Sequence, residues 1–407
     1  MMASLRMESS GMESSGMESG RMELSGMESG RMESGRMESS GIKLNGMESS
    51  RIESLRVEDL DFGIDVGQYV ADRTAEARGL ARDSVKMLVV HRSTGRLQDT
   101  RFSSLPDFLE AGDVLVVNSS ATIPARLAVH SQGQHHFIHL AARLSANRFL
   151  IERRGGHGEA DARFWPEGTA ITVLGGDVNG RPAASCRVNR RFHPNSRLWE
   201  VEADEDLYQL APSIGSPIRY DYVKQDTTAG DYRTIFARIA GSSEMPSASR
   251  PFTKPILRQL ARRGVKVASI TLHTSVSSHE VETDLSQHPV LPEWYQVSEQ
   301  SATVINRAKA NGNRIIAVGT TAVRAIESSV DASGKVMPQQ GWTTHLVTPS
   351  TKPKVVTSLV TGMHDNHTSH LALMYAFILP DTLRQAYRVA ADHGYLWHEF
   401  GDISLIL

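Results

Sequence analysis

Arg314–Ser329, RIIAVGTTAVRAIESS, joins an apolar strand to a helix through a glycine turn. The apolar run that ends at Val318 predicts a buried strand, and the residues from Ala322 to Ser328 predict a helix. Gly319 permits a tight turn and a close approach of the backbone to a neighbour. A buried strand that leads directly into a helix is typical of an α/β layer.

The same turn is a candidate binding site. Thr320 and Thr321 are predicted to cap the helix, so that its free N–H groups and its dipole face a negative group. Arg324 lies one turn further along the helix, where its guanidinium could clamp a carboxylate. An ordinary capped strand–helix joint has the same sequence pattern. No Walker lysine and no G-x-G-x-x-G accompany the turn, so triphosphate and dinucleotide binding are not supported.

The alternation of strands and helices continues on the N-terminal side of this stretch. Lys86–His91 and Asp113–Asn118 are short apolar runs bounded by turn signals, which predicts two buried strands. Thr253–Arg263 has the pattern of an amphipathic helix, and the strand Val265–Leu272 follows it. A further helix is predicted over Ser298–Ala310. These elements extend the α/β layer over much of the chain.

Residues 128–215 have a different pattern. Gly-rich turns at 155–158 and 175–180 separate short alternating or β-rich stretches, which suggests a small β-barrel. The stretches are Phe137–Leu140, Arg148–Arg153, Ala170–Leu174, Ala184–Asn189 and Leu198–Glu202. The sequence therefore predicts an α/β main domain, formed by residues 57–127 and 216–407, with an inserted β-barrel domain at 128–215.

Residues 1–56 are predicted to be a disordered low-complexity extension. Between residues 7 and 57 a repeat of five residues recurs, with variants of Met-Glu-Ser-Ser-Gly. A period of five matches neither the helical nor the strand period, so no continuous apolar face can form. The functional interpretation is an interaction tail. The alternatives are a dispensable extension, or an upstream stretch included by a start codon assigned too early.

Composition favours a cytoplasmic protein with no membrane partner. The 407 residues carry a net charge of -2 and a single cysteine, Cys186, which excludes an internal disulfide framework. No apolar run reaches the roughly 18 residues that a membrane helix needs, and no signal-peptide h-region is seen. Beyond residue 56 there are 37 basic and 37 acidic residues. This balance does not favour nucleic-acid binding, although one local basic patch would suffice for it.

One such basic patch lies in the predicted barrel. No aspartate or glutamate occurs between residues 178 and 199, and this segment contains Arg181, Arg187, Arg190, Arg191 and Arg197. The patch could contact a phosphate backbone. A solvated barrel face with alternating charges is the other interpretation.

Histidines form the other candidate sites. His273 ends a predicted strand, where it could transfer a proton or hold a structural hydrogen bond. His364, His367 and His370 are three residues apart, so on a helix their side chains would point in different directions and could not share a metal ion; we therefore predict no metal here. We predict instead a loop that is followed by a helix cap at Thr368 or Ser369. For similar reasons we predict surface positions on a strand for His135, His136 and His139.

Several stretches of residues 57–407 match the motifs of one enzyme family in one order. Ala317–Ser328 (AVGTTAVRAIES) matches its most specific motif nearly residue for residue. The other matches are Asp113–Leu127 (DVLVVNSSATIPARL), Asp231–Ala237 (DYRTIFA), Thr271–His273 (TLH), Pro292–Val297 (PEWYQV), Gly341–Thr343 (GWT), His364 and Phe400–Leu407 (FGDISLIL). The chain thus resembles the S-adenosylmethionine:tRNA ribosyltransferase-isomerases of queuosine biosynthesis, in which a β-barrel is inserted into the larger α/β domain.

The resemblance implies a reaction. Ribose from S-adenosylmethionine passes to the aminomethyl group of a 7-aminomethyl-7-deazaguanine base in tRNA, adenine and methionine leave, and the isomerised sugar gives epoxyqueuosine. Such chemistry needs a base for the C5′ proton, an acid that releases adenine and a clamp for the methionine carboxylate. The resemblance implies His273 as the base and His364 as the acid or a hydrogen-bond donor, and the two roles could be exchanged.

The resemblance also implies binding residues, with S-adenosylmethionine as co-substrate, no metal, tRNA as a partner and a monomeric protein. Arg324 and the turn of Gly319, Thr320 and Thr321 would hold the methionine carboxylate, while Trp342 or Tyr295 would stack on adenine. Residues expected to contact the acceptor are Arg126, Tyr232, Arg190 and Arg191.

Four family motifs are altered in this chain. They are Pro246–Phe252 (PSASRPF for Pro-Thr-Ala-Gly-Leu-His-Phe), Asn118–Ala121 (NSSA for Asn-Asp-Thr-Arg), Thr274–His279 (TSVSSH for Val-Gly-Leu-Gly-Thr-Phe) and Gly362–Asn366 (GMHDN for Asn-Phe-His-Leu-Pro). Two alternatives therefore stay open. One is ribosyl transfer to a small-molecule amine in a secondary pathway, and the other is a non-catalytic tRNA- or S-adenosylmethionine-binding paralogue.

Overall fold

The computed structural model describes residues 55–407 except 156–158, 160, 162, 177, 195, 277–283, 286–287 and 289. The predicted disordered extension therefore lies outside the described residues, apart from Leu55 and Arg56. Within the described part of the chain, no helix is long and apolar enough to cross a membrane.

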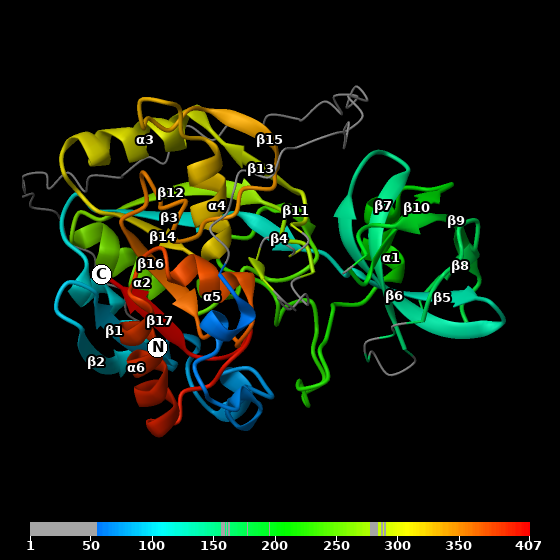
Figure 1. Ribbon diagram of the computed structural model, residues 1–407, viewed down its shortest axis with the longest axis horizontal. Coiled ribbons are helices and arrows are strands. Elements are labelled where there is room, and N and C mark those ends of the chain that lie inside the picture. Colours follow the sequence, from blue (N-terminus) through cyan, green and yellow to red (C-terminus); the bar gives the residue numbers. More distant parts are fainter. Residues whose placement is uncertain are drawn as a thin grey trace, which may run out of the picture. The chain divides into compact units, whose positions relative to one another are not determined.

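A nine-stranded mixed sheet is the centre of the larger domain in the described part of the chain (Figure 1). Its strands, in spatial order, are β15 (Gln339–Thr343), β13 (Glu293–Val297), β12 (Lys266–Leu272), β3 (Val114–Asn118), β14 (Ile315–Val318), β16 (Ser358–Gly362), β17 (Ile403–Ile406), β1 (Lys86–His91) and β2 (Arg96–Arg101). β12, β3, β14 and β16 are parallel neighbours, so their carboxyl ends share one edge of the sheet.

Helices cover both faces of the central strands. Alternate residues of β3 enter two different cores: Val116 packs in the core that contains residues of α3 (Glu299–Ala310) and α4 (Thr320–Ser328). Its neighbour Val117 packs in the core that contains residues of α2 (Lys254–Arg262). Because both faces are buried, these strands are continuous apolar runs without polar alternation. The predicted α/β layer is confirmed, and Figure 1 shows α3 and α2 on either side of β3.

Shorter elements complete the larger domain. β4 (Ser120–Thr122) and β11 (Ile239–Ser242) pair in parallel. α5 (Ser369–Met374) begins after Thr368, whose hydroxyl accepts a hydrogen bond from the Leu371 N–H, as the predicted cap requires. The remaining helix is α6 (Pro380–Asp392), and the 3₁₀ turns are Val57–Leu60, Val66–Tyr69, Glu76–Arg78, Arg82–Ser84, Phe102–Phe108 and Ser247–Ser249.

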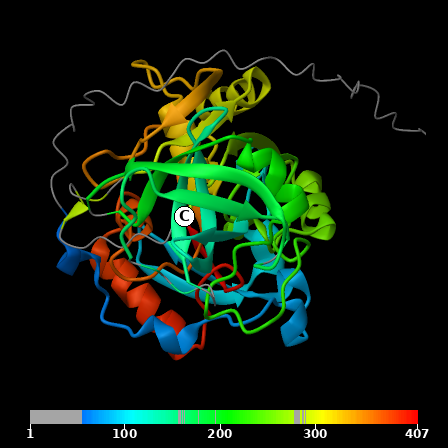
Figure 2. The same ribbon diagram turned by 90° about the vertical axis from the view of Figure 1, so that its right-hand side faces the viewer.

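The predicted β-barrel is confirmed as a closed antiparallel barrel in the described residues (Figure 2). Its strands, in spatial order, are β10 (Leu198–Ala203), β7 (Arg148–Arg154), β6 (Gln134–Arg143), β5 (Arg126–Ser131), β8 (Ala170–Leu174) and β9 (Pro182–Arg191). One core of apolar side chains fills it, and residues of α1 (Leu207–Ile214) pack into the same core. The exact boundaries 127/128 and 215/216 between the domains stay a prediction.

The surface prediction for the β6 histidines is wrong for two of the three. His136 and His139 are 0% and 1% exposed, whereas His135 is exposed. His136 shares a face of the strand with Ile138, which belongs to the barrel core, and its ring lies 5.6 Å from the ring of Trp165. His139 faces the other way, and its Nδ1 lies 3.7 Å from the buried Glu152 carboxylate.

Candidate active site

A cavity opens at the edge of the sheet where the parallel strands β14 and β16 end. Ligand sites of α/β proteins commonly lie beyond the carboxyl ends of such strands. The first part of its wall consists of Gly319, Thr320 and Thr321 after β14, Thr361–His364 at the end of β16, and Thr274 after β12. Most of the remaining wall comes from residues 243–248 and from Asp365, Thr368, His370, His398, Glu399, Tyr222 and Tyr232.

The start of α4 forms one side of the cavity, but its cap differs from the prediction. Gly319 is the N-cap residue, with a φ of 87°, and no side chain caps the helix. The left-handed backbone lets the chain turn from β14 into α4 and suits glycine. Thr320 and Thr321 are therefore the first helical residues. The backbone N–H groups of these two residues have no acceptor within the helix, because they lie in its first turn. This end of α4 therefore suits an anionic group.

Three histidines line the same cavity. The His364 and His370 rings stack 5.1 Å apart at an angle of 5°, and the Thr361 hydroxyl lies 2.7 Å from His364 Nε2. The backbone of His364 is also fixed, because its N–H donates to the Tyr387 hydroxyl and its carbonyl accepts from the Trp397 indole. The third histidine, His398, has a left-handed φ of 71°, which is uncommon outside glycine and often marks a functional position.

Burial keeps these histidines neutral. It lowers the pKa of His364 well below its usual value, and the nearby His370 and His398 lower it further. The pKa of His370 falls to about 4, and that of His398 is lowered too, in each case chiefly by burial. At neutral pH each ring therefore keeps one nitrogen lone pair, which can accept a proton or a hydrogen bond.

Two glutamates reach the cavity together with tyrosine partners. The Tyr222 hydroxyl donates to Glu399, and the Tyr220 hydroxyl donates to Glu244. Burial raises the pKa of Glu399 to about 7, and the Glu244 charge adds to this, whereas the hydrogen bond from Tyr222 opposes it. Neither glutamate was predicted from the sequence as a site residue. The only signal was that Glu399 directly precedes the matched C-terminal motif Phe400–Leu407.

His273, the predicted base, lies next to the cavity wall and is not itself among the described lining residues. Its Nδ1 is 2.8 Å from the Ser120 hydroxyl, which contacts the Ser242 hydroxyl at 2.6 Å. The Ser242 oxygen in turn accepts from the backbone N–H of Thr274, which does line the cavity. Burial lowers the pKa of His273 to about 4. The structure thus links His273 to the cavity through hydroxyl groups.

Arg324, the predicted carboxylate clamp, is not among the described residues that line the cavity, although its charge acts on the lining residue His370. Its guanidinium forms an ion pair with Glu293 and donates to the carbonyl oxygen of His345. The Glu293 carboxylate also accepts from the backbone N–H of Ser275 at 2.9 Å. The side chains of Arg324 and Glu293 are only 17% and 7% exposed. The sequence could not show this because Glu293 lies on β13, far from Arg324 along the chain.

The predicted adenine-stacking residues also lie away from the described cavity wall. Trp342 is an exposed residue of β15, the edge strand of the sheet. Tyr295 is buried on β13, where its hydroxyl donates to the carbonyl of Ser328. Of the predicted acceptor contacts, Tyr232 lines the cavity, whereas Arg126 stacks on the ring of Phe137 at 3.4 Å.

The arginines of the basic patch have acidic neighbours from an adjacent strand. Arg190 Nε lies 3.0 Å from Glu200 on β10, although its side chain remains 58% exposed. Arg191 is exposed, and its Nε donates to the backbone carbonyl of Ser196. Strand pairing in the barrel places Glu200 directly opposite Arg190, which reduces the charge that the sequence suggested.

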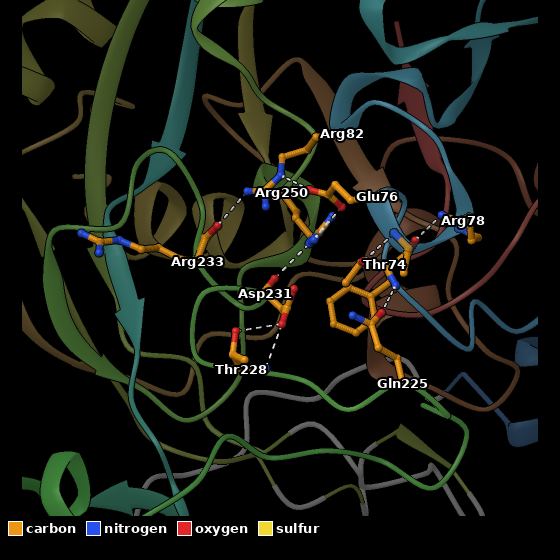
Figure 3. A network of polar contacts seen from close by, with 11 residues as sticks. Thr74, Glu76, Arg78, Arg82, Gln225, Thr228, Asp231, Arg233 and Arg250 are labelled. Carbon is orange, nitrogen blue, oxygen red and sulfur yellow. Dashed lines mark hydrogen bonds and ion pairs between the residues drawn. The ribbon is translucent and has the colours of Figure 1, made fainter.

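A buried arginine supports another part of the cavity wall (Figure 3). Arg250, in the altered motif Pro246–Phe252, is 4% exposed; it donates to Glu76 and to the Asp231 carbonyl, each at 3.0 Å. Its guanidinium also lies 5.1 Å from the ring centre of Phe400. Arg250 lies just after the cavity-lining residues Pro246–Ala248 in the chain. Its contacts therefore hold this segment against Glu76, Asp231 and Phe400.

Within the described residues, no group of three or more His, Cys, Asp or Glu side chains is arranged to hold a metal ion. Of the predicted site residues, the structure gathers Gly319, Thr320, Thr321, His364 and Tyr232 around one cavity. His273 lies close behind its wall. The described cavity wall excludes Arg324, Trp342, Tyr295, Arg126, Arg190 and Arg191.

Comparison with known proteins places the chain in a family. Residues 57–406 match the queuosine biosynthesis protein family. A relative from Moorella thermoacetica, named S-adenosylmethionine:tRNA ribosyltransferase-isomerase, is 33% identical over 356 residues, which is 86% of this chain and 99% of the relative. A relative of the same name from Symbiobacterium thermophilum is 33% identical over 353 residues, or 85% of this chain and 99% of the relative.

Among solved structures, an S-adenosylmethionine tRNA ribosyltransferase from Thermotoga maritima is 25% identical. The match covers 86% of this chain and 100% of that chain, with a TM-score of 0.46. The family match over residues 57–406 and the near-complete coverage of the curated relatives lead to one conclusion: the chain belongs to the queuosine biosynthesis protein family.

Proposed function

We propose that this chain is a cytoplasmic, monomeric enzyme that transfers and isomerises the ribosyl group of S-adenosylmethionine onto a 7-aminomethyl-7-deazaguanine base in tRNA. The products are epoxyqueuosine, adenine and methionine, and the reaction needs no metal. The observation that carries the proposal is the cavity at the ends of β14 and β16. It combines the N-terminal end of α4 with histidines that burial keeps neutral, and it lies within residues 57–406, which match the family.

The donor is held, in this proposal, by the start of α4. The backbone N–H groups of Thr320 and Thr321 bind the methionine carboxylate, and the helix dipole favours its negative charge. Arg324 is a positioning residue rather than the clamp, because its guanidinium holds Glu293 and through it the backbone of Ser275. That backbone directly follows Thr274 of the cavity wall.

His364 is the proton acceptor in this proposal, and His273 is a positioning residue. His364 lines the cavity, and its pKa lies well below the usual value, so its neutral form persists at physiological pH. A neutral imidazole has a lone pair that can take the C5′ proton of the donor; because the lowered pKa makes His364 a weak base, this transfer depends on the adjacent sulfonium, which acidifies the proton. His273 acts through Ser120 and Ser242 and positions Thr274.

Adenine release tests the proposed function directly. The protein is incubated with S-adenosylmethionine and with tRNA that carries the 7-aminomethyl-7-deazaguanine base, and free adenine is measured. We expect release that depends on this tRNA and is absent with tRNA that carries guanine at the same position. Release with a small primary amine and none with tRNA would contradict the tRNA acceptor and support the small-molecule alternative. The absence of release with any amine would support the non-catalytic alternative.

The barrel is the proposed contact for the tRNA backbone. Replacing both Arg190 and Arg191 by Ala is expected to weaken tRNA binding and, if each contacts one phosphate, to make its salt dependence shallower by about 1.4–1.8 units of slope, because fewer counterions are released. Filter binding over a series of salt concentrations measures both effects. Arg258→Ala with Arg262→Ala is the matched control, since these exposed residues lie on α2 and remove the same charge. Equal effects of the two double variants would exclude a specific contact.

A further inference from the structure

Glu399 and Glu244 contact the hydroxyl groups of two stacked tyrosine rings at the cavity. The Tyr220 and Tyr222 rings stack 5.7 Å apart at 14°, and Tyr222 stacks on His398 at 4.2 Å and 15°. Each tyrosine hydroxyl donates to one of the two glutamates. Stacked rings with hydrogen-bonded ends hold side chains in fixed places, so the two carboxylates are preorganised at the cavity wall.

The ionisable groups of the described cavity wall make it acidic. The wall contains Glu244, Asp365 and Glu399, and none of its described residues is lysine or arginine. Its three histidines contribute no positive charge at neutral pH, because burial lowers their pKa values. A cationic group in the cavity would therefore meet carboxylates, and the described residues of the wall supply no lysine or arginine that would compete with it.

We propose that Glu399, together with Glu244, binds the primary ammonium group of the acceptor and that Glu399 then takes one of its protons. This inference rests on the proposed function, which supplies the aminomethyl acceptor. An ammonium has three N–H donors and no acceptor, which suits a site formed by two carboxylates. The donor carries an ammonium too, on the methionine carbon that bears the carboxylate; we place that carboxylate, and with it the donor ammonium, at the start of α4, and the comparison of donor and acceptor binding below tests this choice.

The proton transfer makes the acceptor reactive. An alkylammonium has no lone pair, so its nitrogen cannot form a bond to the ribosyl carbon until one N–H bond breaks. In this step an N–H bond of the ammonium breaks and an O–H bond forms on Glu399. The nitrogen keeps the electron pair, and Glu399 becomes a neutral carboxylic acid. The pKa of Glu399, raised to about 7, suits a proton acceptor that works near neutral pH.

The pH dependence follows from the same group. Glu399 faces the Tyr222 hydroxyl and the Glu244 carboxylate, with His398 next to it in the chain and Asp365 3.5 Å from His398. Above about pH 7 Glu399 is charged and binds an ammonium; below that value protonation removes the charge. Affinity for a cationic acceptor should therefore rise as the pH increases from 6 to 8. Affinity for a neutral analogue should stay constant.

Two soluble bases that differ in one group test this inference. Calorimetry on the full chain, in the presence of S-adenosylmethionine, compares 7-aminomethyl-7-deazaguanine with its neutral 7-cyano analogue at pH 6 and pH 8. We expect the amine to bind more tightly than the nitrile at pH 8 and to lose most of this advantage at pH 6. Glu399→Gln should weaken amine binding at pH 8 by about 10- to 100-fold and leave nitrile binding unchanged.

Tyr222→Phe is the second variant, since it keeps the ring stack and removes only the hydrogen bond to Glu399. That bond lowers the pKa of Glu399, so its loss should move the midpoint of amine binding to higher pH. A midpoint unchanged in Tyr222→Phe, or an amine advantage unchanged in Glu399→Gln, would overturn the inference. Weaker S-adenosylmethionine binding in Glu399→Gln with an unchanged amine advantage would assign the glutamate to the donor and also overturn it.

These outcomes are separate from those of the proposed function. If tRNA triggers no adenine release, but the amine advantage is present and depends on Glu399, the ammonium site stands and the tRNA reaction fails. If tRNA triggers release while Glu399→Gln binds and reacts like the wild type, the reaction stands and the assignment of Glu399 fails.

Discussion

Replacing His364 by Asn is expected to slow adenine release from S-adenosylmethionine by about 10²- to 10⁴-fold, the usual contribution of a positioned proton acceptor. Asn keeps a polar side chain at this position, but it is too short to replace Nε2, which the Thr361 hydroxyl contacts at 2.7 Å, and it cannot take a proton. Donor affinity, measured by calorimetry, should change only a few-fold, because the start of α4 holds the methionine carboxylate in our proposal.

His367→Asn is the matched control for this experiment. His367 lies three residues away, outside the described cavity wall, and its left-handed φ of 58° is one that Asn tolerates. Its rate of adenine release should equal that of the wild type. Wild-type release by His364→Asn would exclude His364 as the proton acceptor. A loss of donor affinity as large as the loss of rate would instead make it a binding residue.

The second large effect is expected for the ion pair between Arg324 and Glu293. Arg324→Ala should lower the free energy of unfolding by about 3 kcal/mol or more, because it leaves a buried carboxylate without its charged partner. Urea unfolding followed by circular dichroism measures this loss. The side chains of both residues are mostly buried, and the Glu293 carboxylate also fixes the backbone at Ser275.

A double variant separates the charge from the packing. Arg324→Met keeps a similar volume but leaves the Glu293 carboxylate unpaired; adding Glu293→Gln removes that charge, so the double variant should be clearly more stable than Arg324→Met alone. If Arg324→Ala instead unfolds like the wild type and loses only S-adenosylmethionine binding, the guanidinium is a ligand clamp, as the sequence analysis predicted.

The sequence predicted the main elements because their signals are local. The apolar runs of β1, β3 and β14 are buried strands, and the amphipathic pattern after Thr253 is the helix α2. The alternating stretches after residue 128 are barrel strands. Periodicity fails where a strand is buried on both faces, and this is why the exposure of His136 and His139 was predicted wrongly.

Side-chain partners across long sequence separations were beyond the reach of the sequence. The motif around Gly319 correctly placed a turn and a helix start, but nothing near Arg324 in the chain indicates that Glu293 takes up its guanidinium. In the same way, the absence of acids between residues 178 and 199 could not reveal Glu200 opposite Arg190.

The sequence by itself determined the family, the α/β layer, the inserted barrel and the glycine turn at the head of α4. Each of these depends on neighbouring residues or on their order along the chain. Only the tertiary structure decided which side chains share a cavity, because Glu244, His364 and Glu399 come from segments that are distant in the chain. It also decided their charge states: burial, which depends on all surrounding atoms, keeps His364 neutral and raises the pKa of Glu399 to about 7.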